Sequence, residues 1–255
     1  MGSSYEPLKS GKIVAIHQPN YFPWLGFFYK VYASDVFVFH DNVEHSKRYP
    51  TRRTRIRKAA DSEESCWLTV PLKKHSDFTS IKDLEIDHSQ NWQEKHLRKL
   101  KNSYAGTDFF PVVFPKIESW LAESGKLDSL ADLNIFLVKK LLEDLGIPWE
   151  IYRSSELPVA GYGSIYNVRM VKYLGVTHYL SGKGGGNYQT ECEFAKEGIA
   201  LATSGFGEWL AHNNYPQSQG TKSLSGLSVV DALFNLGVEG VMELFAAVGP
   251  IDLEE

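Results

Sequence analysis

Residues able to do acid–base chemistry follow the first apolar run of the chain, Ile13 to His17. The pKa of a histidine is ordinarily about 6.5, so His17 can act as a neutral base near pH 7. Gln18 and Asn20 supply amide donors and acceptors, and two prolines nearby stiffen the turn. We predict that this segment forms one wall of a ligand pocket, with His17 and Asn20 as catalytic residues. The alternative is that His17 only forms a hydrogen bond within the core.

Aromatic residues crowd the same segment, which reads YFPWLGFF from residue 21. We expect Tyr21 and Trp24 to stack on a sugar or base, because aromatic rings offer large flat surfaces with a polar edge. For Phe27 and Phe28, core packing behind the site is the better reading.

An anion site is predicted after the second apolar run, which Asp41 ends. Seven basic residues crowd the segment from 47 to 58, and guanidinium groups match the geometry of phosphate and carboxylate. If this segment is a strand, Arg53, Arg55 and Arg57 point to one side. We predict Asp41, Arg52, Arg53 and Arg55 as substrate-binding residues, and a solvated charged face is the alternative.

Two later segments add candidates. The sequence SGKGGGNYQ has neither the Walker A ending nor the dinucleotide-binding spacing, but Lys183 and the backbone of Gly184, Gly185 and Gly186 could hold a phosphate or an oxyanion. A plain surface turn is the alternative. In HNNYPQSQ, His212 is a second candidate base, and Tyr215 and Gln217 are candidate substrate-binding residues.

The elements that must position these residues alternate between short apolar strands and helices, which favours an α/β fold with a mostly parallel sheet, flanking helices and a helical insert. Ligands of such sheets bind beyond the carboxyl ends of the strands, where the candidates above lie. The expected strands are 13–17, 36–40, 67–72, 83–86, 150–153, 178–181 and 199–202, and the expected helices are 90–104, 111–122, 127–145, 167–174 and 228–236. We predict an α/β domain of residues 12–90 and 146–240, a helical insert or subdomain of 91–145, and terminal segments 1–11 and 241–255.

Composition limits the classes of function. The net charge of −4 gives no global reason to expect nucleic acid or a membrane as the main partner. Two cysteines are too few for a disulfide framework and fit a reducing compartment, so we expect a cytoplasmic protein without a membrane span. No zinc-protease, paired-cysteine or G-x-S-x-G motif is present, and no metal ligands are predicted.

The motifs AIHQPNYFPWLGFFYK, WLTVPL, YLSGKGGGNYQ, YPQ and LSVVDALFNLG occur in an order that resembles the WbqC-like protein family over residues 12–237. The resemblance implies a bacterial protein of surface-polysaccharide or O-antigen biosynthesis. It also implies transfer of an amino acid such as glycine onto an amino sugar.

Two classes of function fit these residues. The first is an aminoacyl-type transferase that acylates a nucleotide-linked or lipid-linked amino sugar, with His17 or His212 as the base, Asn20 or the glycine amides facing the oxyanion, and Arg53, Arg55 and Lys183 holding phosphate. Its donor would be an acyl group on a carrier or an aminoacyl-tRNA, or an amino acid activated with ATP as an adenylyl or nucleotidyl transferase would do. The second is a non-catalytic nucleotide-sugar-binding or scaffold protein of the same pathway. The oligomeric state is not predicted.

Overall fold

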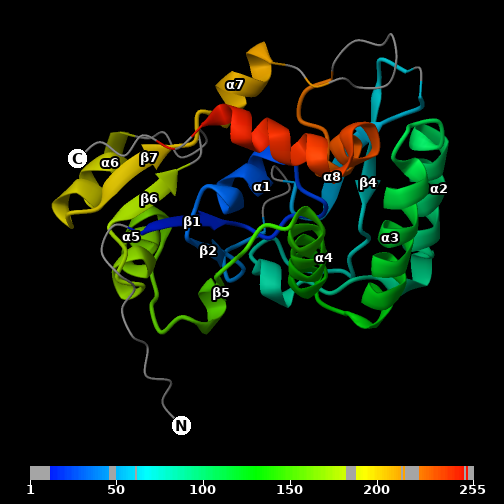
Figure 1. Ribbon diagram of the computed structural model, residues 1–255. Helices are drawn as coiled ribbons and strands as arrows, with labels where there is room; N and C mark the ends of the chain where they lie inside the picture. Colours follow the sequence, from blue (N-terminus) through cyan, green and yellow to red (C-terminus); the bar gives the residue numbers. More distant parts are fainter. Residues whose placement is uncertain are drawn as a thin grey trace.

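A twisted parallel sheet forms the centre of the computed structural model, which describes residues 12–45, 50–60, 62–181, 188–213, 215, 224–249 and 251 (Figure 1). Its strands lie in the order β5-β2-β1-β6-β7 and are all parallel. The bounds are β1 Ile13–His17, β2 Val36–Phe39, β5 Ile151–Arg153, β6 His178–Ser181 and β7 Ala200–Thr203. The predicted α/β class with a mostly parallel sheet is confirmed. The strands are short apolar runs because helices cover both faces of the sheet.

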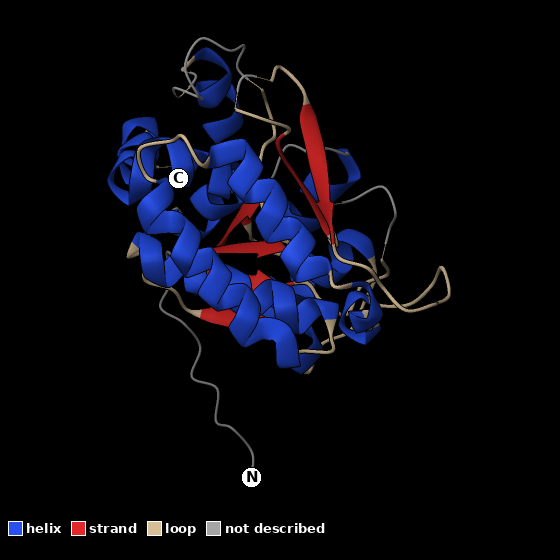
Figure 2. Cartoon of the chain, turned by 90° about the vertical axis from the view of Figure 1, so that its right-hand side faces the viewer, coloured by secondary structure: helices blue, strands red, loops and turns tan. Residues whose placement is uncertain are grey.

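The two faces of the sheet have separate apolar cores. Alternate residues of β1 divide between them: Ala15 packs with helices α1, α4 and α8, and Val14 and Ile16 pack with α5 and α6. Figure 2 shows the central strands surrounded by helices. The helix bounds are α1 Leu25–Tyr32, α2 Trp92–Tyr104, α3 Phe110–Glu123, α4 Leu130–Leu145, α5 Gly163–Tyr173, α6 Tyr188–Lys196, α7 Phe206–His212 and α8 Val229–Val248.

Strand order reverses direction beside β1. The chain first adds β2 and β5 on one side of β1, and later adds β6 and β7 on the other side. At such a reversal the connections at the carboxyl ends of neighbouring strands run to opposite faces and leave a crevice, which is where open α/β sheets bind ligands. The end of β1, with His17, lies at this position.

A second sheet of two antiparallel strands, β3 Arg53–Arg57 and β4 Ser65–Thr69, stands beside the central sheet. Its apolar face, with Ile56 and Leu68, joins the same core as α2 and α3. The arginine-rich run is therefore a strand, and the register pairs Arg53 with Thr69 and Arg55 with Trp67. The alternation of the arginines was expected for a strand, but Arg57 is fully buried rather than available at the surface.

Several elements differ from the expected ones. Residues 83–86 do not form a strand, because Ile81–Asp83 is a 3-10 helix, and Glu85 and Ile86 form only isolated bridges, with Ser129 and Leu72. Helix α1 was not expected, because its sequence is apolar almost throughout and shows no helical alternation. Helix α8 continues to Val248 beyond a kink at Gly237, whose φ of 68° is left-handed.

One apolar core contains both sheet residues and residues of the predicted helical insert, such as Leu100 and Leu137. The division of the chain into a domain and an insert stays a prediction. Within the part of the chain that the structure describes, no helix combines the length and the apolar character needed to cross a membrane.

Candidate functional site

His17 ends β1 and has a defined tautomer. Its Nδ1 lies 2.9 Å from the carbonyl oxygen of Gln18, and a carbonyl can only accept, so Nδ1 carries the hydrogen. Burial, followed by the nearby Lys30, lowers the pKa of His17 to about 4. The imidazole is therefore neutral near pH 7 and keeps a lone pair on Nε2. Trp24 and Phe27 hold the ring by edge contacts, at centroid distances of 5.4 Å and 5.1 Å.

Lys30 of α1 is a buried cation beside this histidine. Its side chain is 6% exposed, and Nζ donates to the carbonyl of Ile16 at 3.3 Å. Successive carbonyls of a strand point to opposite sides within the sheet. The His17 carbonyl accepts from the backbone N–H of His40 on the β2 side, so the Ile16 carbonyl points to the β6 side. The amine therefore lies at the strand-order reversal. Burial lowers its pKa to about 8, so it remains mostly charged at pH 7.

Two buried amide oxygens near the end of β1 have no hydrogen-bond donor among the described residues. One is Oδ1 of Asn20, whose side chain is 2% exposed, and the other is Oδ1 of Asn134 on α4. Asn134 donates from Nδ2 to the carbonyls of Pro19 and Thr51, at 2.9 Å and 2.7 Å, which fixes its orientation. An unsatisfied buried acceptor is costly, and an N–H group of a ligand could satisfy it.

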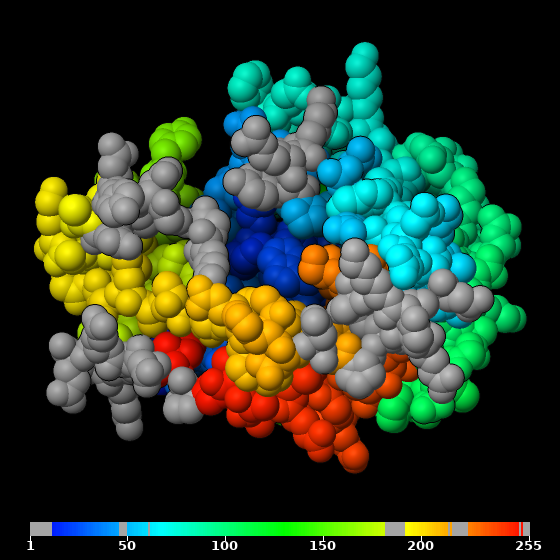
Figure 3. Space-filling view, turned by 90° about the horizontal axis from the view of Figure 1, so that it is seen from above, coloured from blue at the N-terminus to red at the C-terminus, as the bar shows by residue number. Residues whose placement is uncertain are grey.

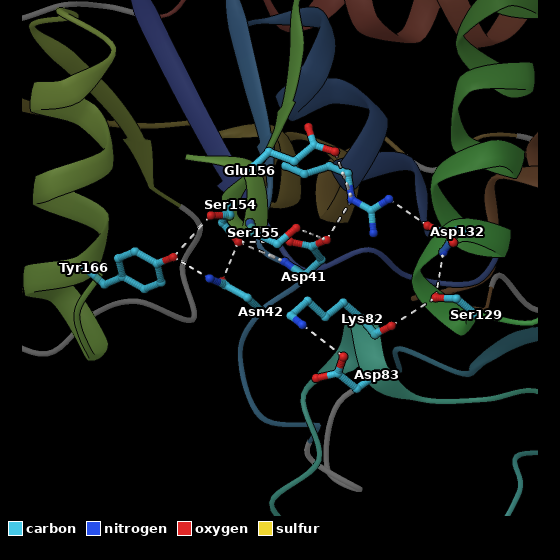
Figure 4. A network of polar contacts seen from close by, with 11 residues as sticks. Asp41, Asn42, Lys82, Asp83, Ser129, Asp132, Ser154, Ser155, Glu156 and Tyr166 are labelled. Carbon is cyan, nitrogen blue, oxygen red and sulfur yellow. Dashed lines mark hydrogen bonds and ion pairs between the residues drawn. The ribbon is translucent and has the colours of Figure 1, made fainter. Parts of the chain in front are cut away.

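Asp41 is fully buried at the end of β2, and its carboxylate is held by the protein. It accepts from Nε of Arg153 at 2.8 Å, and from the backbone N–H and hydroxyl of Ser155 at 3.0 Å and 2.8 Å. Figure 4 shows this network, which continues through Asn42 to Tyr166 on α5. Asp41 thus ties β2 to β5, and its contacts indicate a structural role in place of direct substrate binding.

His40 stands next to Asp41 on the opposite face of the sheet from His17. Burial lowers its pKa to about 4, and its ring packs 5.0 Å from the ring of Tyr166. Its buried Nδ1 has no hydrogen-bond partner among the described residues. His40 directly follows β2, and His17 is the last residue of β1, so a histidine at the end of an apolar run is a signal in the sequence that could have identified both.

Arg53 and Arg55 lie on β3, and Arg52 directly precedes it. The strand is linked to the segment after β1. Ser228 links the two segments, because it forms a bridge with Trp24 and its N–H donates to the carbonyl of Arg55 at 2.8 Å. The guanidinium of Arg55 donates to the Ser65 hydroxyl, at 3.1 Å from Nε and 2.8 Å from Nη2. Arg53 lies over the ring of Trp67 at 4.4 Å, and neither it nor Arg52 has an ion pair among the described residues. These cations are available to an anion.

Three other predicted residues have different surroundings. Tyr21 is fully buried, and its hydroxyl contacts Nδ1 of His96 at 2.9 Å. Tyr215 donates to the buried carboxylate of Asp231 at 2.7 Å. His212 lies at the exposed end of α7, where Nδ1 donates to the Glu208 carbonyl at 2.8 Å, and the structure records no contact with His17.

Lys183, Gly184, Gly185, Gly186 and Gln217 lie outside the described residues. Among the residues that the structure does describe, no group of three or more histidine, cysteine, aspartate or glutamate side chains is arranged to hold a metal ion.

The surface above the end of β1 is hollowed. Figure 3 shows a blue floor formed by the segment near the N-terminus, with α7 in yellow-orange, the orange segment before α8, and the cyan β3 and β4 region around it. Contacts join these segments, because Trp24 forms a bridge with Ser228, the Ser228 N–H donates to the Arg55 carbonyl, and the His17 ring contacts Trp24.

A family model described as the WbqC-like protein family matches residues 18–243, which is most of the chain. The chain belongs to the WbqC-like protein family. It is also 28% identical over 237 residues to a protein of Mycobacterium tuberculosis (strain ATCC 25618 / H37Rv) described as uncharacterized protein Rv1507c, covering 89% of this chain and 95% of that protein. The WbqC-like match includes the loop after β1, β3 and most of α8, and it begins at the residue after His17.

Sequence reasoning missed Lys30, His40 and Arg153. A lysine inside the otherwise apolar run LGFFYKVY is a signal that could have identified Lys30. Arg153 has no such signal, because its role depends on the pairing of β5 with β2.

Proposed function

We propose that this protein is a group transferase that acylates the amino group of a nucleotide-linked or lipid-linked amino sugar, with an amino acid such as glycine as the transferred group. The observation that carries the proposal is the pair His17 and Lys30 at the strand-order reversal. A neutral imidazole with a free Nε2 can take a proton, and a cation beside it can stabilise negative charge.

The acceptor amine would be oriented by buried oxygens. The N–H groups of an amine donate hydrogen bonds, and the Oδ1 atoms of Asn20 and Asn134 could accept them, because neither has a donor among the described residues. Arg53 and Arg55 on β3 would hold the phosphate of a nucleotide or lipid carrier, since neither guanidinium is neutralised by a carboxylate among the described residues.

In the proposed reaction the amine nitrogen attacks the acyl carbon of the activated donor and forms the amide bond. Nε2 of His17 takes the proton that the amine loses. The bond between the acyl carbon and its leaving group then breaks, and the leaving group receives the proton from His17. Lys30 would stabilise the oxyanion of the tetrahedral intermediate. A phosphate bound nearby would raise the pKa of His17 from about 4 toward neutrality, where general bases are most effective.

The test is acyl transfer to a nucleotide-linked amino sugar, followed by mass spectrometry for the added glycyl group. Separate reactions supply glycine with ATP, a glycyl-carrier protein, and glycyl-tRNA, which distinguishes direct activation with ATP from a donor activated elsewhere. We expect product in one arm, and we expect His17→Ala to lower the rate by about a hundredfold or more, the usual contribution of a general base, while the sugar nucleotide still binds.

His212→Gln is the matched control, because it removes an exposed imidazole from α7. Binding without product in all three arms would support the alternative, a non-catalytic nucleotide-sugar-binding or scaffold protein. An equal loss in His212→Gln and His17→Ala would contradict the assignment of His17 as the base.

A further inference from the structure

A second cavity, of about 270 Å³, lies between β4 and the start of α2. We call it the α2 pocket. The lining residues used below are Trp67, Trp92, Lys95, His96, Arg98 and Lys99. None of its lining residues is an aspartate or glutamate. Tyr21, which follows β1, contacts His96 of this pocket, but neither Tyr21 nor His17 lines it.

The cations of the α2 pocket crowd one side of a helix. Lys95 lies three residues before Arg98 and four before Lys99, so its side chain neighbours both, and like charges at these spacings destabilise a helix. Lys99 donates to the carbonyl of Trp67 at 2.9 Å. Lys95 and Arg98 have no ion pair among the described residues. In a chain with a net charge of −4, this is a local excess of positive charge without an internal partner.

The aromatic walls of the α2 pocket are held in place. Trp67 is 41% exposed, and the guanidinium of Arg53 lies 4.4 Å from its ring centroid. Trp92 is 2% exposed and makes edge contacts with Tyr21 and His96, at centroid distances of 6.1 Å and 5.3 Å. An exposed tryptophan supported by a cation is a ready platform for a ring.

His96 does not add to the charge of the pocket. Burial lowers its pKa to about 4, and it hydrogen-bonds to the backbone of Thr69 and to the hydroxyl of Tyr21. The positive charge near pH 7 therefore comes from the lysines and the arginine, and the imidazole serves to fix Trp92 and Tyr21.

We propose that the α2 pocket is a second ligand site, for a phosphorylated small molecule whose ring rests on Trp67. Lys95 and Arg98 would bind the phosphate, because cations without carboxylate partners suit a doubly charged oxyanion. The volume of about 270 Å³ lies just below the range of about 300–1,000 Å³ usual for ligand pockets, so we expect a small ligand such as a sugar phosphate or a nucleoside monophosphate. His17 and Lys30 do not line this site. Arg53, which the proposed transfer reaction uses to hold a phosphate, lies over Trp67, so the two sites adjoin there.

The test uses the full chain and three probes: inorganic phosphate, a hexose 1-phosphate and adenosine monophosphate. Binding is measured by titration calorimetry and by tryptophan fluorescence, because two tryptophans line the pocket. We expect at least one ring-bearing probe to bind more tightly than inorganic phosphate. The double variant Lys95→Gln, Arg98→Gln should weaken that binding by about tenfold or more, as expected for the loss of charge-assisted hydrogen bonds. Trp67→Ala should reduce the affinity to that of inorganic phosphate.

Lys101→Gln is the matched control, because Lys101 is exposed on α2 and does not line the pocket. It should bind as the wild type does, and circular dichroism should show all variants folded. The two ring-bearing probes distinguish a sugar phosphate from a nucleotide as the natural source.

Three results would overturn the proposal. The first is that no probe binds. The second is binding that His17→Ala abolishes and the double variant leaves intact, which would place the ligand at the end of β1. The third is binding of an RNA oligonucleotide that the double variant weakens, with no binding of the small probes, which would make this face a nucleic-acid surface.

Discussion

Lys30 is a buried charge for which the fold offers little compensation. The residue is 6% exposed, and among the described residues its ammonium makes one long hydrogen bond, to a backbone carbonyl at 3.3 Å. Buried lysines are rare unless paired, and burial lowers the pKa of this one to about 8. A buried cation next to His17 destabilises the fold, and groups with strongly shifted pKa values are typical of functional sites.

We therefore expect Lys30→Met to stabilise the protein while lowering acyl transfer. Below pH 8 Lys30 is charged in both the folded and the unfolded state, so the folded state bears the full free-energy cost of burying the charge. This cost decreases as the pH rises from about 8 to 10.5. Removing the charge should raise the free energy of unfolding at pH 7 by about 1–3 kcal/mol, the upper value being the full shift. Urea denaturation measures this.

The control for this change is Lys101→Met, which alters an exposed lysine and should change stability little. A destabilised Lys30→Met protein would show that the amine has a structural role that its single contact does not reveal. Full activity in a stabilised variant would remove Lys30 from the proposed reaction.

At the scale of elements, local signals identified the helix-to-strand junctions well. Gly146, with a φ of 65°, ends α4 before β5, and Gly175, with a φ of 69°, precedes β6, as the glycines in the sequence indicate. Helix α1 escaped prediction because both of its faces are buried, which erases the periodicity of an amphipathic helix. The kinked second half of α8 escaped because a glycine inside a helix pattern normally indicates its end.

Only the residues of the candidate site that have a local signal in the sequence were predicted. His17 and Asn20 stand at the end of a recognisable strand, so local sequence identifies them. Asn134 and Lys30 come close to them only through tertiary packing. The pairing of Tyr215 with Asp231 likewise depends on how α8 packs, and a single sequence does not show it.

The kink of α8 gives a test at this scale. A Cβ atom on Gly237 would lie 2.5 Å from the ring of Phe109, and the φ of 68° is unfavourable for any residue with a side chain. We expect Gly237→Ala to lower the free energy of unfolding by about 2–4 kcal/mol, from strain in the backbone and overpacking against Phe109, the residue before α3. Thermal denaturation measures the change.

Gly207→Ala is the matched control, because Gly207 lies within α7 and a Cβ there meets nothing within 4 Å. It should be neutral or stabilise by up to about 1 kcal/mol, since alanine favours a helix. Equal effects of the two substitutions would contradict the role assigned to the kink.

At the scale of the whole molecule, neutral histidines are distributed through the cores. Burial is the main cause that lowers the pKa of His17, His40 and His96 to about 4. His17 and His40 lie on opposite faces of the central sheet, and His96 lies on α2 beside the second sheet. Acid should therefore act on several parts of the fold together.

We expect the free energy of unfolding to fall as the pH decreases from about 6.5 to about 4. In this window the unfolded chain takes up protons that the folded histidines refuse, so each histidine contributes stability above pH 6.5 that is lost toward pH 4. Each contributes at most about 3 kcal/mol, a large share of the 5–15 kcal/mol usual for a folded protein. Denaturant titrations at a series of pH values should show that His96→Gln reduces the slope by up to about 1.4 kcal/mol per pH unit, the value for one proton. An unaltered slope in His96→Gln would mean that His96 takes up its proton over the same pH range in the folded protein as in the unfolded chain. Burial beside Tyr21 would then not keep the ring neutral.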